Sequence, residues 1–499
     1  MCGACCANEN IRQNHPSVNK RPFTSALLIL IASAVQAQIA QQVPRLVVNI
    51  AIDQLSTDYI EAFAPYFGSE GFKKLLDKGK VYENAEYPFS PTDRASAIAT
   101  IATGSYPFYH GIIGTRWLDR NSLRLTGCTD DQQYSGVFTT DKASPKNLLT
   151  STIGDELKVS TAGKAIVYAI AKEKDAAILS AGHAADGALW KDSYTQNWCS
   201  SSYYIKKTPT WLSEYNVSEG SKKKKTEFQE LTDLTNLAVL CIEKAGMGTD
   251  NVTDLLNITL DASPDLSGKK TTDWQSNMAQ TYMNLDRQLA DLVATIESKV
   301  GSPNVTFYLT GTGYTEEPID DYRHYGVPAG TFYINRTANL LNMYLGALHG
   351  SDRYVEGCSR NHIYLNLKLI EQKRLKLSEI LAESQSFLLQ CDGVLNVHTS
   401  ESLLRSGQGE TQKIRNGYHA SVGGNLLVET IPGWQVYNED TQEISQTSLR
   451  NISFPIIIYG AGIPAQKIST LVTVDRIAPT IAKSIHIRAP NACAVLPLP

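Results

Sequence analysis

Short apolar runs rich in β-branched residues alternate along this chain with longer stretches whose apolar residues recur at helical spacing. The short runs have the length and composition of buried strands, and the longer stretches have the period of amphipathic helices. The predicted strands lie at 45–52, 165–170, 256–260, 305–310 and 455–459. The predicted helices lie at 70–78, 151–158, 276–299 and 376–388. This alternation predicts an α/β fold with a layered core, in which helices flank a mostly parallel sheet.

Two long stretches, 184–250 and 330–450, break this alternation. The first is rich in aromatic and polar residues and contains a run of four lysines at 222–225. The lysines are typical of a solvated loop, and the tryptophans favour a packed cap over a ligand site. Because we find neither an internal repeat nor a low-complexity linker, we expect residues 38–499 to form a single domain in which both stretches are cap insertions.

The first 37 residues are predicted to be a signal peptide with an N-terminal extension. Lys20 and Arg21 precede the apolar run Ala26–Ala34, and Val35-Gln36-Ala37 has the small-residue pattern of a cleavage site. A short buried helix is the alternative for this run. No other run in the sequence is long enough to span a membrane. We therefore expect a periplasmic or secreted mature protein without a transmembrane segment.

Composition narrows the class of protein and its partners. The 499 residues carry a formal net charge of −4, so no basic field favours a nucleic-acid partner. Hydrophobic residues make up 42% and charged residues 19%, as in ordinary globular proteins. Six of the nine cysteines follow Ala37, which permits three disulfides with fifteen possible pairings in an oxidising compartment. None of the six forms a CxxC pair, so a structural zinc knuckle is not expected.

Asp53 directly follows the first predicted strand. Open α/β sheets bind ligands at the carboxyl ends of their strands, so this position makes Asp53 a candidate site residue. The alternative is that its carboxylate caps the following turn.

A more specific pattern covers nearly the whole mature chain, in seven stretches. They are LVVNIAIDQLSTDYI (46–60), 91–117 with PTDRASAIATIATG and HGIIGTRW, STIGDELK (151–158), AAILSAGHAADGALW (176–190), NGYHASVGGNLLVETIPGW (416–434), PIIIYGAGI (455–463) and DRIAPTIAKSIHIRAPNAC (475–493). Together they make the chain resemble the periplasmic alkaline phosphatases with a threonine nucleophile, which belong with the type I phosphodiesterase and nucleotide pyrophosphatase group. The resemblance implies the alkaline phosphatase fold, two zinc ions and hydrolysis of phosphate esters.

The position of the family's nucleophile is occupied by arginine. It is the fourth residue of a stretch that runs here without a gap from Pro91 to Gly104, which places Arg94 there. A guanidinium cannot attack phosphorus. The Gly-His that follows in the family is replaced by Ala97-Ile98. A shifted register would offer Thr92 or Thr100 as the nucleophile, but the ungapped spacing argues against it.

By the same resemblance, two positions that would hold zinc keep a carboxylate, at Asp53 and Asp265. The other matched positions have lost their ligands, and they hold Lys269, Thr312, Gly313 and Ser453. We therefore expect no cofactor, and zinc only if the protein is an enzyme after all. Two carboxylates with water could instead bind a hard cation such as Mg²⁺ or Ca²⁺.

The groups that would hold the phosphate are replaced as well. Thr115 stands where the family has an asparagine, and Glu173 and Asp175 stand where it has lysine and arginine. Two cations have become two anions, so this edge should repel a phosphate. None of the nine histidines falls on a matched ligand position, and we expect His110 and His183 to be buried and hydrogen-bonded.

The new cations could compensate the retained carboxylates. Removing two zinc ions would leave Asp53 and Asp265 as uncompensated charges, and Arg94 and Lys269 add two positive charges at matched positions. The alternative is that Arg94 points to solvent.

The sequence thus favours a secreted pseudophosphatase, inactive as an enzyme, that binds or assembles with an unknown protein. One alternative is a metal-dependent phosphomonoesterase or phosphodiesterase with an altered site. Another is a binding protein for an anionic small molecule that uses Arg94 in the old cleft. The fold alone does not decide between these readings.

Overall fold

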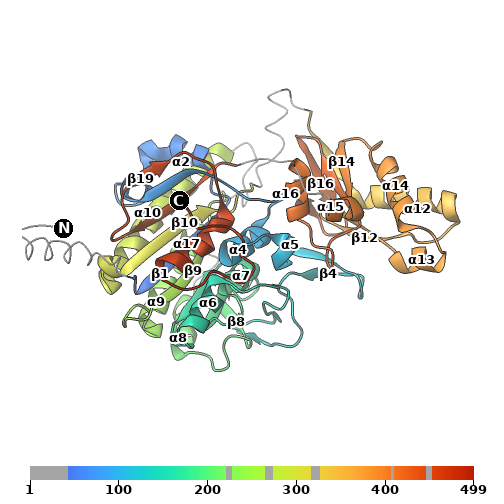
Figure 1. Ribbon diagram of the computed structural model, residues 1–499. Coiled ribbons are helices and arrows are strands. Elements are labelled where there is room, and N and C mark those ends of the chain that lie inside the picture. Colours follow the sequence, from blue (N-terminus) through green and yellow to red (C-terminus); the bar gives the residue numbers. More distant parts are fainter. Residues whose placement is uncertain are drawn as a thin grey trace, which may run out of the picture. The chain divides into compact units, whose positions relative to one another are not determined.

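The computed structural model describes residues 43–220, 227–264, 274–315, 326, 328–405, 409–445 and 452–499 (Figure 1). The predicted signal peptide, the lysine run at 222–225, Asp265 and Lys269 lie outside the described residues. Within the described ranges, no helix is both long and apolar enough to cross a membrane.

Eleven strands of the described chain form one large sheet, in the order β19-β2-β18-β10-β1-β9-β6-β7-β8-β5, with β20 paired to β2. At its centre β1 (Leu46–Asp53) lies parallel between β10 (Val305–Gly311) and β9 (Asp254–Asp261). Beyond β9, β6 (Val167–Ala171) and β7 (Gly187–Lys191) continue the parallel arrangement. The other strands are β2 (Lys80–Glu86), β5 (Gly136–Val137), β8 (Trp198–Ser201), β18 (Phe454–Gly460), β19 (Gln466–Ile468) and β20 (Val472–Thr473).

The apolar sequence of β1 explains its central place. All eight of its residues are buried, and successive side chains point to opposite faces of the sheet. Val47 and Ala51 belong to the hydrophobic cluster on one face, whereas Val48 and Ile50 belong to the cluster on the other. A strand that is covered on both faces needs such a continuous apolar run.

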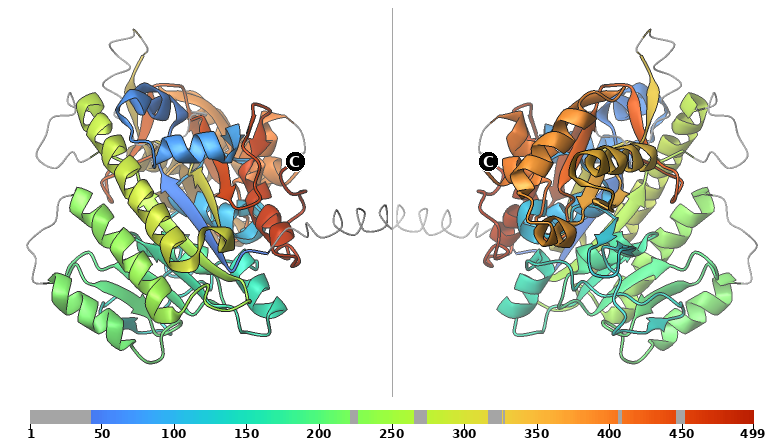
Figure 2. Two further views of the ribbon diagram at one scale, coloured as in Figure 1. Left: turned by 90° about the vertical axis from the view of Figure 1, so that its left-hand side faces the viewer. Right: turned by 90° about the vertical axis from the view of Figure 1, so that its right-hand side faces the viewer.

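Helices supply both of these clusters (Figure 2). The cluster with Val47 includes α4 (Arg94–Thr103), α6 (Ile153–Ser160), α7 (Lys174–Ala181) and α17 (Ile477–Ser484). The cluster with Val48 includes α2 (Thr57–Phe63), α3 (Phe72–Lys78), α8 (Thr210–Gly220), α9 (Glu227–Ala245) and α10 (Trp274–Val300). The long yellow-green helix in the left view of Figure 2 is α10.

The predicted fold class is confirmed, because a mostly parallel sheet lies between helices. All nine predicted strands and helices are present, and their ends differ from the predicted ones by at most two residues.

Residues 330–445 contain a hydrophobic cluster of their own. Their strands form a four-stranded sheet, β12-β13-β15-β14, and a three-stranded sheet, β11-β16-β17. The strands are β11 (Gly330–Tyr333), β12 (Val355–Ser359), β13 (His362–Leu365), β14 (Val394–Thr399), β15 (Leu426–Thr430), β16 (Trp434–Asn438) and β17 (Glu443–Ser445). The helices are α12 (Ile334–His349), α13 (Leu367–Gln372), α14 (Leu377–Leu388), α15 (Ser400–Arg405) and α16 (Glu410–Asn416). We refer to residues 330–445 as the cap segment.

The other predicted insertion, 184–250, is partly built into the large sheet. It supplies β7 and β8, and its helix α9 packs against α10, where Thr235 donates to Gln288 Oε1 at 2.9 Å. The division of residues 38–499 into one domain with two caps stays a prediction.

The described chain also holds α5 (Pro107–His110) and a two-stranded sheet of β3 (Arg116–Asp119) and β4 (Arg124–Gly127). The cysteines that follow Ala37 are all free, so none of the permitted disulfides is formed: Cys128, Cys199, Cys241, Cys358, Cys391 and Cys493.

Candidate functional site

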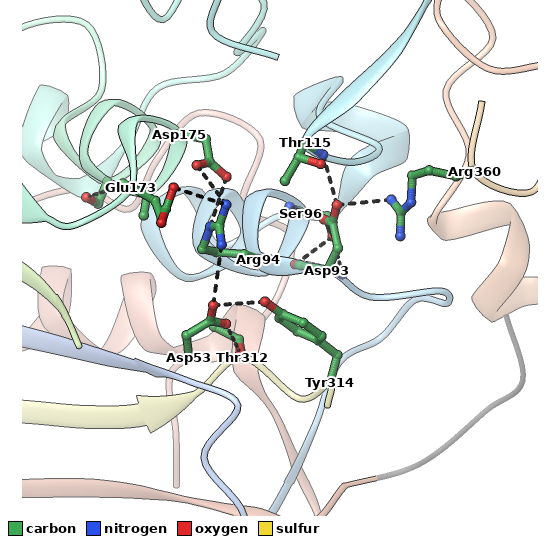
Figure 3. A network of polar contacts seen from close by, with 12 residues as sticks. Asp53, Asp93, Arg94, Ser96, Thr115, Glu173, Asp175, Thr312, Tyr314 and Arg360 are labelled. Carbon is green, nitrogen blue, oxygen red and sulfur yellow. Dashed lines mark hydrogen bonds and ion pairs between the residues drawn. The ribbon is translucent and has the colours of Figure 1, made fainter. Parts of the chain in front are cut away.

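Arg94 begins helix α4 and points toward the carboxyl edge of the sheet rather than to solvent (Figure 3). Its Nε and Nη2 donate to Asp175 Oδ2 and Oδ1, each at 3.2 Å, in a two-pronged ion pair. Its Nη1 lies 3.7 Å from Asp53 Oδ2, and its Nη2 lies 3.9 Å from Glu173 Oε2. Burial opposes the charge of Arg94, but Asp175 and Asp53 outweigh burial and raise its pKa.

Asp53 ends β1 and is buried beneath this guanidinium. Its Oδ1 accepts a hydrogen bond from the Thr312 hydroxyl at 2.7 Å, and its Oδ2 accepts one from the Tyr314 hydroxyl at 2.8 Å. Burial raises the pKa of Asp53 to about 7, although Arg94 acts in the opposite direction. The carboxylate therefore depends on protein donors for its stability.

The two acidic residues predicted to replace the family's cations both lie at the start of α7. Glu173 occupies the N-cap position, and Asp175 lies in the first turn. Asp175 is buried, whereas the Glu173 side chain is half exposed. Burial raises the pKa of Glu173, and Arg94 opposes this shift. The structure thus brings Glu173 and Asp175 to the guanidinium of Arg94, the residue predicted to stand at the nucleophile position.

The described residues do not fit a pair of zinc ions. Both oxygens of Asp53 accept hydrogen bonds from hydroxyl groups, and Arg94 approaches one of them. Gly313 brings no side chain, and the Ser453 hydroxyl donates to Asn84 Oδ1 at 3.4 Å, outside this network. Zinc needs several nitrogen, sulfur or carboxylate donors in a fixed geometry. In the ranges that the structure covers, no group of three or more His, Cys, Asp or Glu side chains could hold a metal ion.

Asp93, which precedes Arg94, anchors the start of α4. Its Oδ1 accepts from the Ser96 backbone N–H at 2.9 Å and from the Ser96 hydroxyl at 2.7 Å. Its Oδ2 accepts from the Thr115 backbone N–H at 2.9 Å and from Arg360 Nη1 at 3.0 Å. Thr115, the predicted substrate-contact position, therefore touches the site through its backbone.

The threonines that a shifted register would offer have other partners. Thr100 is buried within α4, and its hydroxyl bonds Ser96 O at 2.9 Å and His110 Nε2 at 3.1 Å. The Thr92 hydroxyl donates to Gly313 O at 3.4 Å.

The prediction that His110 is buried and hydrogen-bonded is confirmed. Its Nδ1 accepts from the Ile112 backbone N–H at 3.1 Å, and burial lowers its pKa to about 3, so the ring is neutral. His183 is hydrogen-bonded as predicted, but it is only half-buried. Its Nδ1 lies 3.1 Å from Asp155 Oδ2 and its Nε2 lies 3.0 Å from Leu148 O. Both partners are acceptors, and the bond to Asp155 raises the pKa of His183.

Sequence reasoning missed four residues of this network. Tyr314 lies two residues beyond the matched Thr312, and Asp261 ends β9 directly opposite Asp53. Asp93 could have been found from the Asp-x-x-Ser spacing of a capping box, since Ser96 follows it at the required distance. Arg360 carries no local signal, because it comes from the distant cap segment.

Comparisons with known proteins agree with this fold. The family described as type I phosphodiesterase / nucleotide pyrophosphatase matches residues 47–451. Alkaline phosphatase PafA of Elizabethkingia meningoseptica is 26% identical over 94% of this chain and 97% of its own length. Alkaline phosphatase PhoV of Synechococcus elongatus is 25% identical over 90% and 91%.

A solved structure shows the same arrangement of elements. The crystal structure of wild-type PafA superimposes with a TM-score of 0.82 at 24% identity, over 91% of this chain and 98% of that chain. The chain therefore belongs to the type I phosphodiesterase / nucleotide pyrophosphatase family, and it has the fold of an alkaline phosphatase.

Proposed function

We propose that this protein is a pseudophosphatase, which keeps the family's fold and serves in binding or assembly rather than in hydrolysis of phosphate esters. The observation that carries the proposal is the ion pair of Arg94 with Asp175. It fills the position of the nucleophile with a cation and holds that cation with one of the substituted anions.

The charges at the site oppose phosphate binding. Three carboxylates, at Asp53, Glu173 and Asp175, surround the single guanidinium of Arg94. A phosphate that entered here would meet more negative than positive charge in a partly buried setting, where Coulomb repulsion is poorly screened. Two of the three guanidinium nitrogens of Arg94 bond Asp175, and the third lies 3.7 Å from Asp53, which speaks against the anion-binding alternative.

The threonines near Arg94 also lack a group that would activate them as nucleophiles. An activated hydroxyl needs a base or a metal ion beside it. Thr100 is buried and bonded within its helix, and Thr92 lies against Gly313 O. The Thr312 hydroxyl donates to Asp53 at 2.7 Å and accepts from the Gln54 backbone N–H at 3.0 Å, so these two bonds hold it at the buried end of β1.

We further propose that the protein is exported by cleavage after Ala37 and that residues 38–499 form one domain. The cleavage proposal rests on the apolar run and small-residue pattern at the N-terminus, and the single-domain proposal rests on the lack of an internal repeat or low-complexity linker in the sequence. Mass spectrometry of the protein secreted by its natural host tests the cleavage point, and a start other than Gln38 would refute it.

The hydrolase test combines activity with metal content. The purified mature protein is assayed with an aryl phosphate monoester and a diester, with added zinc or magnesium, and its metals are counted by mass spectrometry. A metal-loaded alkaline phosphatase is the positive control. We expect no turnover above the blank and far less than two zinc ions per chain. Turnover that is lost in Asp53→Asn, together with stoichiometric zinc, would establish the metal-dependent hydrolase instead.

Arg94→Thr is the informative companion variant. It restores a hydroxyl at the nucleophile position but leaves Thr312, Gly313 and Ser453 unable to hold metal. We expect it to remain inactive, which would show that the loss is not confined to one residue.

A further inference from the structure

Arg360 links the cap segment to the start of α4. It lies in the turn between β12 and β13, where its backbone has a φ of 52°. Its Nη1 donates to Asp93 Oδ2 at 3.0 Å and to Ile113 O at 3.1 Å. Its side chain is only 14% exposed, although it belongs to a hairpin turn. The left-handed backbone conformation, which is unfavourable for a residue other than glycine, indicates that surrounding contacts hold this turn.

The space for the guanidinium depends on Gly114. A Cβ atom at position 114 would lie 2.2 Å from Arg360 Nη1 and 3.1 Å from Asp93 Oδ2. Any other residue would therefore push Arg360 away from Asp93. The absence of a side chain at Gly114, between α5 and β3, provides the space that the Arg360 guanidinium occupies.

Asp93 connects Arg360 with the start of α4, where Arg94 lies. Its Oδ2 is shared between Arg360 and the Thr115 N–H, while its Oδ1 caps α4 through Ser96. Asp93 is the N-cap residue, and Arg94 is the first residue of the helix. Figure 3 shows Arg360 and Asp175 on opposite sides of the start of α4. The direction in which the Arg94 side chain leaves the helix thus depends on the geometry of the cap at Asp93.

We infer that Arg360 is a positioning residue for Arg94: it fixes the Asp93 carboxylate, which fixes the first turn of α4 and so aims the Arg94 guanidinium at Asp175. The cap segment is therefore coupled to the substituted site through one hairpin turn. This inference concerns where Arg94 lies, whether or not the protein hydrolyses phosphate esters. Hydrolase activity, if detected, would overturn the proposed function but would leave this inference about Arg360 unchanged.

A competing interpretation is that Arg360 only helps to hold the cap segment against the rest of the chain. A variant of Arg120 distinguishes the two interpretations, because Arg120 makes a comparable set of contacts with the cap segment. It donates to Gly423 O at 2.9 Å and to Asn425 Oδ1 at 3.0 Å, and its guanidinium lies 5.0 Å from the centre of the Tyr364 ring. It has no bond to Asp93, so Arg120→Met is the matched control.

The experiment follows α4 and Arg94 separately in the full mature chain. Hydrogen exchange reports the backbone amides of Ser96 and Thr115, which both donate to Asp93, and an arginine-selective ¹H–¹⁵N spectrum reports the Nε–H of Arg94. In Arg360→Met we expect these amides to exchange about fivefold faster, the scale of a weakened helix cap, and the Arg94 signal to shift. Arg360→Lys keeps a cation near Asp93 and should restore part of the protection.

Two results would overturn the inference. One is unchanged exchange at Ser96 and Thr115 with an unshifted Arg94 signal in Arg360→Met. The other is an equal change in Arg120→Met, which would show general loosening of the cap segment. If Arg360→Met does not fold, Arg360→Lys tests the inference by itself. Wild-type exchange and an unshifted Arg94 signal in Arg360→Lys would contradict a role for the contacts of the Arg360 guanidinium with Asp93 and Ile113.

Discussion

Replacing Arg94 with methionine tests whether the substituted charges hold the old site together. Methionine keeps most of the apolar stem but removes the guanidinium. Asp175 then loses two hydrogen bonds at 3.2 Å, and Asp53 loses the cation that lies 3.7 Å from its Oδ2. Both carboxylates are buried, so they cannot recover this loss from water.

The expected cost follows from the burial of the pair. Removing one partner of a buried ion pair costs about 3–5 kcal/mol. The Arg94 side chain is 24% exposed, so water screens part of the interaction and the lower end, about 3 kcal/mol, applies. At about 2.1 cal/mol/K per residue over roughly 450 residues, the entropy of unfolding is about 1 kcal/mol/K, and the melting temperature should fall by about 3 °C.

Differential scanning calorimetry near pH 7.5 measures this shift. Arg116→Met is the control, because the ion pair of Arg116 with Glu443 is partly exposed to water and should contribute less than about 1 kcal/mol. In a double-mutant cycle, Arg94→Met with Asp175→Asn should lose less stability than the two single changes added together. A melting temperature of Arg94→Met that equals that of the wild type would refute the compensation argument, since the buried carboxylates would then need no cation.

Three further outcomes follow from other parts of the structure. The ion pair of Lys191 with Asp233, at 2.8 Å and almost fully buried, predicts that Lys191→Met alone costs about 3–5 kcal/mol in chemical denaturation, while the double change with Asp233→Asn costs less than the sum. His183 has a pKa raised above 6.5 by Asp155, so its contribution is complete below about pH 6.5 and is lost as pH rises through the folded-state pKa. The stability of the wild type should therefore fall more steeply than that of His183→Asn between pH 6 and 9, and parallel curves would contradict this. Dialysis against a chelator should leave the melting temperature unchanged, and a marked drop that added zinc reverses would reveal a structural metal.

The sheet could be predicted from sequence where burial leaves a simple pattern. β1, β9 and β10 are covered on both faces and are therefore continuous apolar runs. β2, with the sequence KVYENAE, mixes charged and apolar residues because only part of it is buried, so its sequence does not predict a strand. β8, with WCSS, is fully buried but is stabilised by hydrogen bonds of its serines, so it has no apolar signature.

At the candidate site, the sequence indicated the residues but not the contacts between them. The resemblance assigned Arg94, Glu173 and Asp175 to separate roles, a lost nucleophile and two lost phosphate contacts. Arg94 and Asp175 are 81 positions apart in sequence, and only the fold brings them together. Residue types alone suggest that Arg94 compensates Asp53, but they do not show that the nearest carboxylate is Asp175. Tyr314 was missed because a neutral hydroxyl beside a glycine carries no signal of its own.

On the proposed correspondence with the family, the contact between Arg94 and Asp175 makes the substitutions at positions 94, 173 and 175 interdependent. If only position 94 changed to arginine, that arginine would lie beside the family's two cations and be repelled by them. If only positions 173 and 175 changed to acids, those acids would lie near Asp53 with no cation between them. Each change alone is unfavourable, whereas together they form an ion pair with a satisfied geometry. The same reasoning applies in reverse: Arg94→Thr leaves three neighbouring carboxylates without a cation and gains a hydroxyl without a metal to activate it. On this argument, we expect Arg94→Thr by itself to lose stability without gaining hydrolysis of phosphate esters.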